Sequence, residues 1–114
     1  MDNQYEAIFC IVNTGHSDTV MDAARACGAG GGTVINARGT ASKEAEKLFD
    51  ISIHPEKEIV MILVEKALKN NILHALYKAV GLNTPGQGIA FSVPVEDVIG
   101  LTTKEEKNKQ EEKK

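Results

Sequence analysis

The sequence predicts an α+β fold, and three observations support that prediction. Short apolar runs rich in β-branched residues recur along the chain, as expected for buried strands. Between them lie two segments whose apolar residues recur at helical spacing. A glycine-rich turn follows each helical segment, and glycine is the usual residue just beyond a helix end. The resulting order is β-α-β, a long connection, then β-α-β, which is the ferredoxin-like arrangement.

The first β-α-β unit lies between residues 6 and 37. Residues 6–12 form an apolar run that predicts a buried central strand. Ser17 is placed to cap a helix whose apolar residues from Val20 to Cys27 share one face. Gly28 is the expected residue at the end of this helix, and residues 33–37 predict the second strand.

The second unit begins at residue 58. Residues 58–64 predict a third buried strand, and residues 66–80 predict a helix with one apolar face. Residues 89–93 predict a fourth strand, which Pro94 interrupts, and residues 95–101 predict a short extra C-terminal strand. Residues 103–114 contain no apolar side chain and cannot join a core. We therefore expect one domain over residues 1–102 and a charged, disordered tail over residues 103–114.

The connection between the second and third strands has no clean hydrophobic period. Long connections inside compact domains are usually functional or disordered. Two interpretations remain open for this segment. It forms a flexible loop over about residues 38–54, or it contains a short helix over residues 42–48.

Composition and charge exclude several classes of function. The net charge is −3, which leaves no overall basic surface for nucleic acid. No apolar run approaches the about 18 residues of a membrane span. The polar, acidic start lacks the basic region and cleavage signal of a secretory peptide, so we expect a cytoplasmic protein without membrane insertion.

In a single chain, one apolar face of the predicted sheet would be left without helices to cover it. Right-handed crossovers place both helices on the same face of the sheet. Aromatic residues make up only 4% of the chain, so the core must be aliphatic, and the strands are apolar throughout. We therefore expect subunit association to cover the second face.

Residues for catalysis or metal binding do not recur at any diagnostic spacing. The three histidines lie in a turn, before a proline and within a helix, and no zinc spacing occurs. We expect no enzyme and no metal. Cys10 and Cys27 are predicted to be buried thiols, with a disulfide or a metal site as the alternative.

Two glycine-rich turns are the strongest candidates for a ligand site. They span residues 28–33 and residues 81–88, each directly after a predicted helix. Backbone N–H groups in such turns can point together and hold an anion such as phosphate. The alternative is that both turns are ordinary helix ends. Neither turn has the spacing of a P-loop or of a dinucleotide fingerprint.

With these features in place, the chain resembles the PII (nitrogen regulatory) signal-transduction family over about residues 5–101. The resemblance is sharpest at residues 28–34, 55–64 and 84–93. Residues 84–91, TPGQGIAF, resemble the family's B-loop, and residues 55–59 resemble the close of its long T-loop. The resemblance implies a homotrimer that binds nucleotides in the clefts between subunits. It also implies non-enzymatic signalling to a target protein, a transporter, enzyme or regulator, through the T-loop.

The resemblance also implies which residues form the site. The implied nucleotide-binding residues are Gly31, Thr33, Arg38, Gly39, Thr84, Gly86, Gln87 and Gly88. The implied partner-binding loop includes Thr40, Ser42, Lys43 and Lys47. The loop contains no tyrosine, which rules out the family's tyrosine uridylylation here.

The sequence lacks three positively charged residues that the family has in its nucleotide site. Ile89 replaces the B-loop lysine, and Gly100 and Thr102 replace two arginines of the last strand, while Val60 replaces an acidic residue. Each cation contact to a phosphate contributes roughly 1.5–3 kcal/mol. We therefore expect an adenine nucleotide with fewer charges, such as a monophosphate or cyclic form, unless Lys43, Lys47 or Lys57 substitutes. The alternative function is a trimeric interaction protein that has lost nucleotide binding.

Overall fold

The computed structural model describes residues 4–40, 55–82 and 88–100. In this part of the chain the predicted β-α-β-β-α-β order is present. The elements are β1 (Tyr5–Asn13), α1 (Ser17–Ala26), β2 (Thr33–Arg38), β3 (Glu56–Glu65), the 3-10 helix η1 (Lys66–Leu68), α3 (Lys69–Ala79) and β4 (Gly88–Val95).

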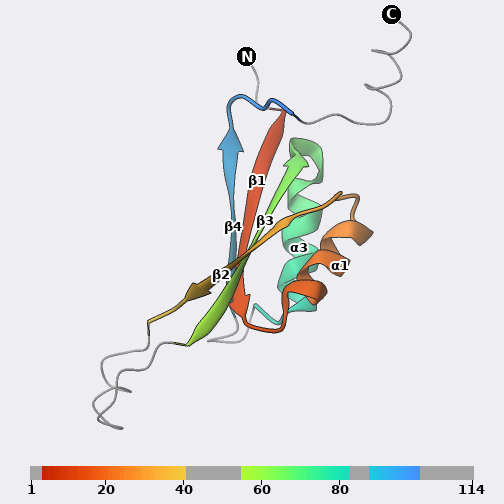
Figure 1. Cartoon of the computed structure of the whole chain (residues 1–114). Coiled ribbons are helices and arrows are strands. Elements are labelled where there is room, and N and C mark those ends of the chain that lie inside the picture. The colour runs from red at the N-terminus through yellow and green to blue at the C-terminus, as the bar shows by residue number, and fades with distance from the viewer. Residues whose placement is uncertain (1–3, 41–54, 83–87, 101–114) are drawn as a thin grey trace, which may run out of the picture.

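The four strands form one antiparallel sheet in the order β2-β3-β1-β4. The two central strands, β3 and β1, are the most apolar runs of the sequence, as expected for strands with neighbours on both sides. Both α-helices pack against the same face of this sheet (Figure 1). This arrangement confirms the predicted α+β, ferredoxin-like fold.

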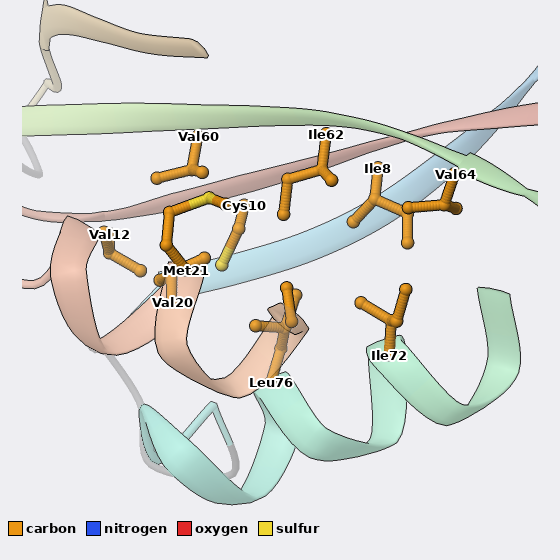
Figure 2. Packing of buried hydrophobic residues seen from close by; sticks show 11 residues of the cluster. Ile8, Cys10, Val12, Val20, Met21, Val60, Ile62, Val64, Ile72 and Leu76 are labelled. Atoms are coloured by element: carbon orange, nitrogen blue, oxygen red, sulfur yellow. The ribbon is translucent and has the colours of Figure 1, made fainter. Parts of the chain in front are cut away.

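The core lies between the sheet and the two helices (Figure 2). Alternate residues of β1 and β3 point toward the helices, and apolar residues of α1 and α3 meet them. The residues buried there are Ile8, Cys10, Val12, Val20, Met21, Ala24, Val60, Ile62, Val64, Ile72 and Leu76. The core is aliphatic, as the low aromatic content predicts.

Both helices end at a glycine in the left-handed region. Gly28 has a φ of +100° and Gly81 a φ of +65°. The Gly28 N–H donates to the Arg25 carbonyl at 3.0 Å, and the Ala29 N–H donates to the Ala24 carbonyl at 3.1 Å. This pair of bonds is the Schellman motif, which satisfies carbonyls at a helix end. For these two glycines, the interpretation as helix ends is confirmed.

The prediction that Ser17 caps α1 is wrong. The N-cap residue is His16, and no side chain of the capping residue bonds to the helix. Instead the backbone N–H of Gly15 donates to Glu58 Oε1 at 2.7 Å. A carboxylate from β3 therefore satisfies a donor just before the helix, which a local reading of the turn could not reveal.

The prediction of an extra C-terminal strand is also wrong for the residues described. β4 continues through Pro94 to Val95, and residues 96–100 form no strand. β4 is an edge strand, where a proline is tolerated because alternate N–H groups point away from the sheet. The β1 partner of Val95 is Tyr5, the first residue of β1, so β1 offers no further pairing partner to residues 96–100.

Candidate functional site

The structure describes part of the predicted site. Gly31, Thr33, Arg38, Gly39 and Gly88 lie among the described residues, and Thr40 is described and exposed. The remaining predicted residues lie outside the described part of the chain: Thr84, Gly86, Gln87, Ser42, Lys43, Lys47 and Thr102.

The described residues of the predicted site lie in three separate places on the sheet. Arg38 pairs with Glu56 at one end of edge strand β2, while Thr33 begins the same strand about 17 Å away. Gly88 begins the opposite edge strand, β4, which is three strand spacings, roughly 14 Å, from β2. A single chain therefore does not bring these residues together.

The first place is a polar hollow at the end of β2, with a volume of about 550 Å³. Its lining residues are Thr14, Asn36, Ala37, Arg38, Glu56 and Lys57. The Gly39 N–H donates to the Pro55 carbonyl at 2.8 Å and closes the base of the 38–54 connection. Lys57 extends from β3 and donates from Nζ to Asn13 Oδ1 on β1. Two cations, the Glu56 carboxylate and hydrogen-bonding side chains thus surround this hollow.

The second place is the glycine turn between α1 and β2. A hollow of about 450 Å³ lies between this turn and the end of β3. Gly31 lines it, and Cβ atoms added to Gly30 and Gly31 would meet nothing within 4 Å. By contrast, a Cβ at Gly32 would lie 2.8 Å from Met21 Sδ and 3.0 Å from the Met61 carbonyl oxygen. Packing within the chain accounts for Gly32, but not for Gly30 or Gly31.

The third place is the start of β4. Gly88 has a φ of +148°, and an added Cβ would lie 2.4 Å from the Ile11 carbonyl oxygen. The fold itself therefore requires glycine here. Ile89, which follows it, is 58% exposed. The hollow beside them is lined by Leu73, Tyr77, Leu82, Gly88, Ile89 and Ala90, so its surroundings are mainly apolar.

The sheet face opposite the helices is apolar and open in the single chain; we call it the open face. Phe9 and Phe91 stack at its centre, with ring centroids 5.3 Å apart. Around this pair lie Ile11, Ile35, Ile59, Met61, Ile89 and Val93. Phe91 and Val93 are each 42% exposed. An apolar surface of this extent is typical of an interface.

Among the described residues, some charged side chains form an ion pair and others do not. The one ion pair found there joins Lys69 Nζ to Glu6 Oε1 at 3.8 Å, and Glu6 is buried at one end of the core. No carboxylate of the described residues lies within 4.0 Å of the Arg38 or Lys57 cation. Positive charge at the polar hollow is therefore not neutralised by an ion pair in this part of the chain.

The two cysteines give no sign of a further reactive site among the described residues. Both cysteines are free thiols, and burial raises the pKa of Cys10 to about 11. The buried-thiol prediction is confirmed for Cys10, whereas Cys27 is partly exposed. Among the described residues, no three His, Cys, Asp or Glu side chains form a group that could hold a metal ion. No helix in the described part of the chain is long and apolar enough to cross a membrane.

Residue-by-residue sequence reasoning missed most of the polar hollow. Thr14 and Asn36 line it but carried no motif. Glu56 and Lys57 belong to the segment that resembles the close of the T-loop, but neither was predicted to bind the ligand, and Lys57 was noted only as a cation that could substitute for missing ones. A signal existed in the alternation of the strands. Asn36 and Glu58 lie opposite each other in the sheet, where Val34 and Val60 form the next pair on the same face, so that face turns polar toward this end.

Two of three comparisons find known proteins that this chain is similar to. The family profile described as nitrogen regulatory protein P-II matches residues 5–105. A search among curated proteins gave no match. Similar solved structures include Arabidopsis thaliana PII bound to citrate, with a TM-score of 0.68, 23% identity, and coverage of 86% of this chain and 83% of that chain. They also include the B. subtilis GlnK–ATP complex, with a TM-score of 0.66, 17% identity, and coverage of 83% and 84%.

The profile match spans nearly the whole domain, and it contains both glycine turns, the 38–54 connection and the four strands of the sheet. The structural likenesses agree with it at the level of the fold. The chain therefore belongs to the nitrogen regulatory protein P-II family.

Proposed function

We propose that this chain is a non-enzymatic regulatory protein that binds an adenine nucleotide between the subunits of a homotrimer. In this proposal, bound ligand changes the 38–54 connection, which a target protein then contacts. The observation that supports it best is the separation of the predicted site into three places on one chain. Residues on opposite edges of one sheet can serve one ligand only if neighbouring subunits complete the site.

The open face supports the homotrimer. Its apolar side chains include the stacked pair Phe9 and Phe91 at the centre of the sheet. Leaving such a surface in water is unfavourable by roughly 25 cal/mol per Å² of apolar area. A threefold arrangement in which each subunit contributes its open face would bury this surface and would bring edge strands of neighbouring subunits together.

The glycine turn supports ligand binding. Gly30 and Gly31 do not have positive φ, and added Cβ atoms there would meet no other described residue within 4 Å, apart from each glycine's own chain neighbours. Glycine allows another group to approach the backbone closely. A ligand or a neighbouring subunit at this turn gives a reason for glycine that packing within the chain does not.

The positively charged side chains near the proposed site indicate how many phosphate charges its nucleotide should carry. At Ile89 and Gly100 the described chain has no positive charge. Arg38 and Lys57 are the cations that line the polar hollow. Glu56 also lines this hollow, so two cations and one carboxylate give its lining a net charge of +1. That charge suits a monophosphate or a cyclic phosphate better than a triphosphate, which carries about four negative charges. The B. subtilis GlnK structure contains ATP, so ATP is nevertheless included among the ligands to test.

Calorimetric titration of the purified protein tests this proposal. We expect one binding site per subunit, with AMP or cyclic AMP bound more tightly than ATP. The titrations use ATP, ADP, AMP and cyclic AMP, each with and without Mg²⁺ and 2-oxoglutarate. Tight Mg²⁺-dependent binding of ATP would contradict the preference for a less charged ligand, and no heat with any nucleotide would contradict nucleotide binding itself.

A second candidate is a trimeric interaction protein that has lost nucleotide binding. The apolar hollow at the start of β4 favours it, because Ile89 and its neighbours offer no cation to a phosphate. In that case the 38–54 connection would still contact a partner protein. The same titration separates the two candidates, since only the first predicts heat.

A further inference from the structure

Arg38 and Glu56 lie directly opposite each other at the two ends of the 38–54 connection, as cross-strand partners in β2 and β3. The next residue, Gly39, donates its N–H to the Pro55 carbonyl at 2.8 Å. Because hydrogen-bonded and non-hydrogen-bonded pairs alternate in an antiparallel ladder, Arg38 and Glu56 form a non-hydrogen-bonded pair. The two side chains of such a pair point to the same face, with Cβ atoms about 4.5–5.5 Å apart.

The Glu56 carboxylate is the one acidic group that lines the polar hollow, and both it and Arg38 are exposed. Within the described part of the chain, the Glu56 carboxylate makes no hydrogen bond and no ion pair, and the Arg38 guanidinium lies more than 4.0 Å from it. Glu58, two residues further along the same face, differs because its carboxylate accepts the Gly15 N–H at 2.7 Å. Glu56 therefore has no structural partner that would account for its charge.

A carboxylate next to the Arg38 side chain opposes the binding of an anion in two ways. It attracts the guanidinium, so an anionic ligand has to compete with it for that cation, and it repels the ligand directly. The repulsion increases with the number of negative charges on the ligand. A carboxylate at this position is therefore more unfavourable for a triphosphate than for a monophosphate, and it has little effect on a neutral ligand.

We infer that Glu56 is a specificity-determining residue of the ligand site, which lowers the positive charge beside Arg38 and so selects against highly charged phosphates. This inference rests on the proposed function, because it assigns a role within the same site. Without the Glu56 carboxylate, the two cations that line the hollow, Arg38 and Lys57, would give its lining a net charge of +2 instead of +1. Removing this one carboxylate should therefore make the site accept phosphates of higher charge.

The test compares variants in calorimetric titrations with adenosine, AMP and ATP, without Mg²⁺ so that the phosphate charges are not neutralised. Glu56→Gln removes the charge and keeps the shape of the side chain, whereas Glu56→Asp keeps the charge. The matched control is Asp22→Asn, which removes an exposed carboxylate of α1 that lines none of the three hollows. Thermal unfolding of every variant confirms that it folds.

We expect Glu56→Gln to tighten the binding of AMP about threefold and that of ATP about tenfold, because the repulsion it removes grows with ligand charge. Adenosine binding should change less than twofold. Glu56→Asp and Asp22→Asn should keep the wild-type ratio of ATP affinity to AMP affinity.

Two results for Glu56→Gln would overturn the inference and leave the proposed function standing. One is unchanged or weaker binding of ATP. The other is an equal change for adenosine, AMP and ATP, which would assign Glu56 a purely structural role. A wild-type protein that binds no nucleotide would overturn both the inference and the proposed function.

Discussion

Single glycine residues in this chain have different physical reasons for being glycine. Gly28 and Gly81 end helices with positive φ, and Gly88 combines positive φ with a close backbone approach. Gly30 and Gly31 satisfy neither condition in the chain. A glycine-rich stretch therefore mixes positions that the fold needs with positions that the fold leaves free. Only the second kind is informative about a ligand or a partner.

Replacing Gly88 with alanine should destabilise the fold strongly, whereas replacing Gly31 with alanine should hardly change its stability. At Gly88 the new Cβ would lie 2.4 Å from the Ile11 carbonyl oxygen at a φ of +148°. We expect Gly88→Ala to lower the free energy of unfolding by roughly 2–4 kcal/mol. Gly31→Ala should change it by no more than about 0.5 kcal/mol. Urea denaturation measures both, and equal stability of the two variants would contradict this assignment.

The Cys10 thiol should make stability depend on pH in alkaline solution. Burial raises the pKa of this thiol from 9.0 to about 11 in the folded chain. Between these values the unfolded state loses the proton and the native state keeps it, so stability falls as pH rises. A shift of two pKa units lowers the free energy of unfolding by roughly 3 kcal/mol at most as the pH rises from 9 to 11. Below pH 9 this thiol causes no decline in stability.

The measurement is the free energy of unfolding between pH 8 and pH 11, compared between the wild type and two variants. Cys10→Ala should remove the part of the decline that the thiol causes, while Cys27→Ala should retain it. The comparison is needed because lysine and tyrosine side chains titrate in the same range. Parallel pH curves for the wild type and Cys10→Ala would count against a buried, protonated Cys10.

At the scale of helices and strands, the sequence predicted an element best where the spacing of its apolar residues matches the residues that are buried. Residues 6–12 and 58–64 predicted the two central strands, because strands covered by neighbours on both sides are almost continuously apolar. Both helices were recognised from one apolar face each, although Met21 also entered the core and was not on the predicted face. The errors lie at element ends, where contacts distant in sequence decide the outcome.

The two errors in the fold show this directly. Ser17 was expected to cap α1, but Glu58 reaches the preceding turn from another strand. Residues 95–101 were expected to form an extra strand, but β1 provides no partner beyond Tyr5. The site follows the same rule. The glycine turns could be found from composition, whereas the hollow around Arg38 and Lys57 depends on the register between β2 and β3.

The start of α1 should depend on Glu58. Its carboxylate accepts the Gly15 N–H at 2.7 Å, just before the helix begins. Glu58→Ala should lower the free energy of unfolding by about 1 kcal/mol, the usual contribution of a capping contact. Glu56→Ala is the matched control, because it removes a glutamate two residues earlier on the same face of β3. Chemical denaturation of both variants decides the matter, and equal losses would argue against a specific cap.

At the scale of the whole molecule, the two faces of the sheet are unequal. One face is sealed by α1 and α3 over an aliphatic core (Figures 1 and 2). The open face carries the stacked pair Phe9 and Phe91 at its centre. Those predicted nucleotide-binding residues that the structure describes lie along both edges of this sheet. Assembly through the open face and completion of the ligand site are therefore two aspects of one arrangement in the proposed homotrimer.

A charge at the centre of the open face should abolish assembly and ligand binding together. Phe91 stacks on Phe9 and is 42% exposed in the single chain. Phe91→Lys would bury an unpaired cation in the interface, which is strongly unfavourable. We expect sedimentation equilibrium at micromolar concentration to find a trimer for the wild type and a monomer for Phe91→Lys. The control is His74→Lys, because His74 is exposed on α3, away from the open face, and lines none of the three hollows described above.

Nucleotide titration of the same two variants links the assembly to the site. Phe91 lines none of the three places where predicted binding residues lie, so a direct effect on ligand contacts is not expected. If subunits complete the site, Phe91→Lys should lose nucleotide binding because it no longer assembles. A monomeric Phe91→Lys protein that binds nucleotide with wild-type affinity would show that one chain suffices, and the separation of Arg38 from Gly88 across the sheet would then need a different explanation.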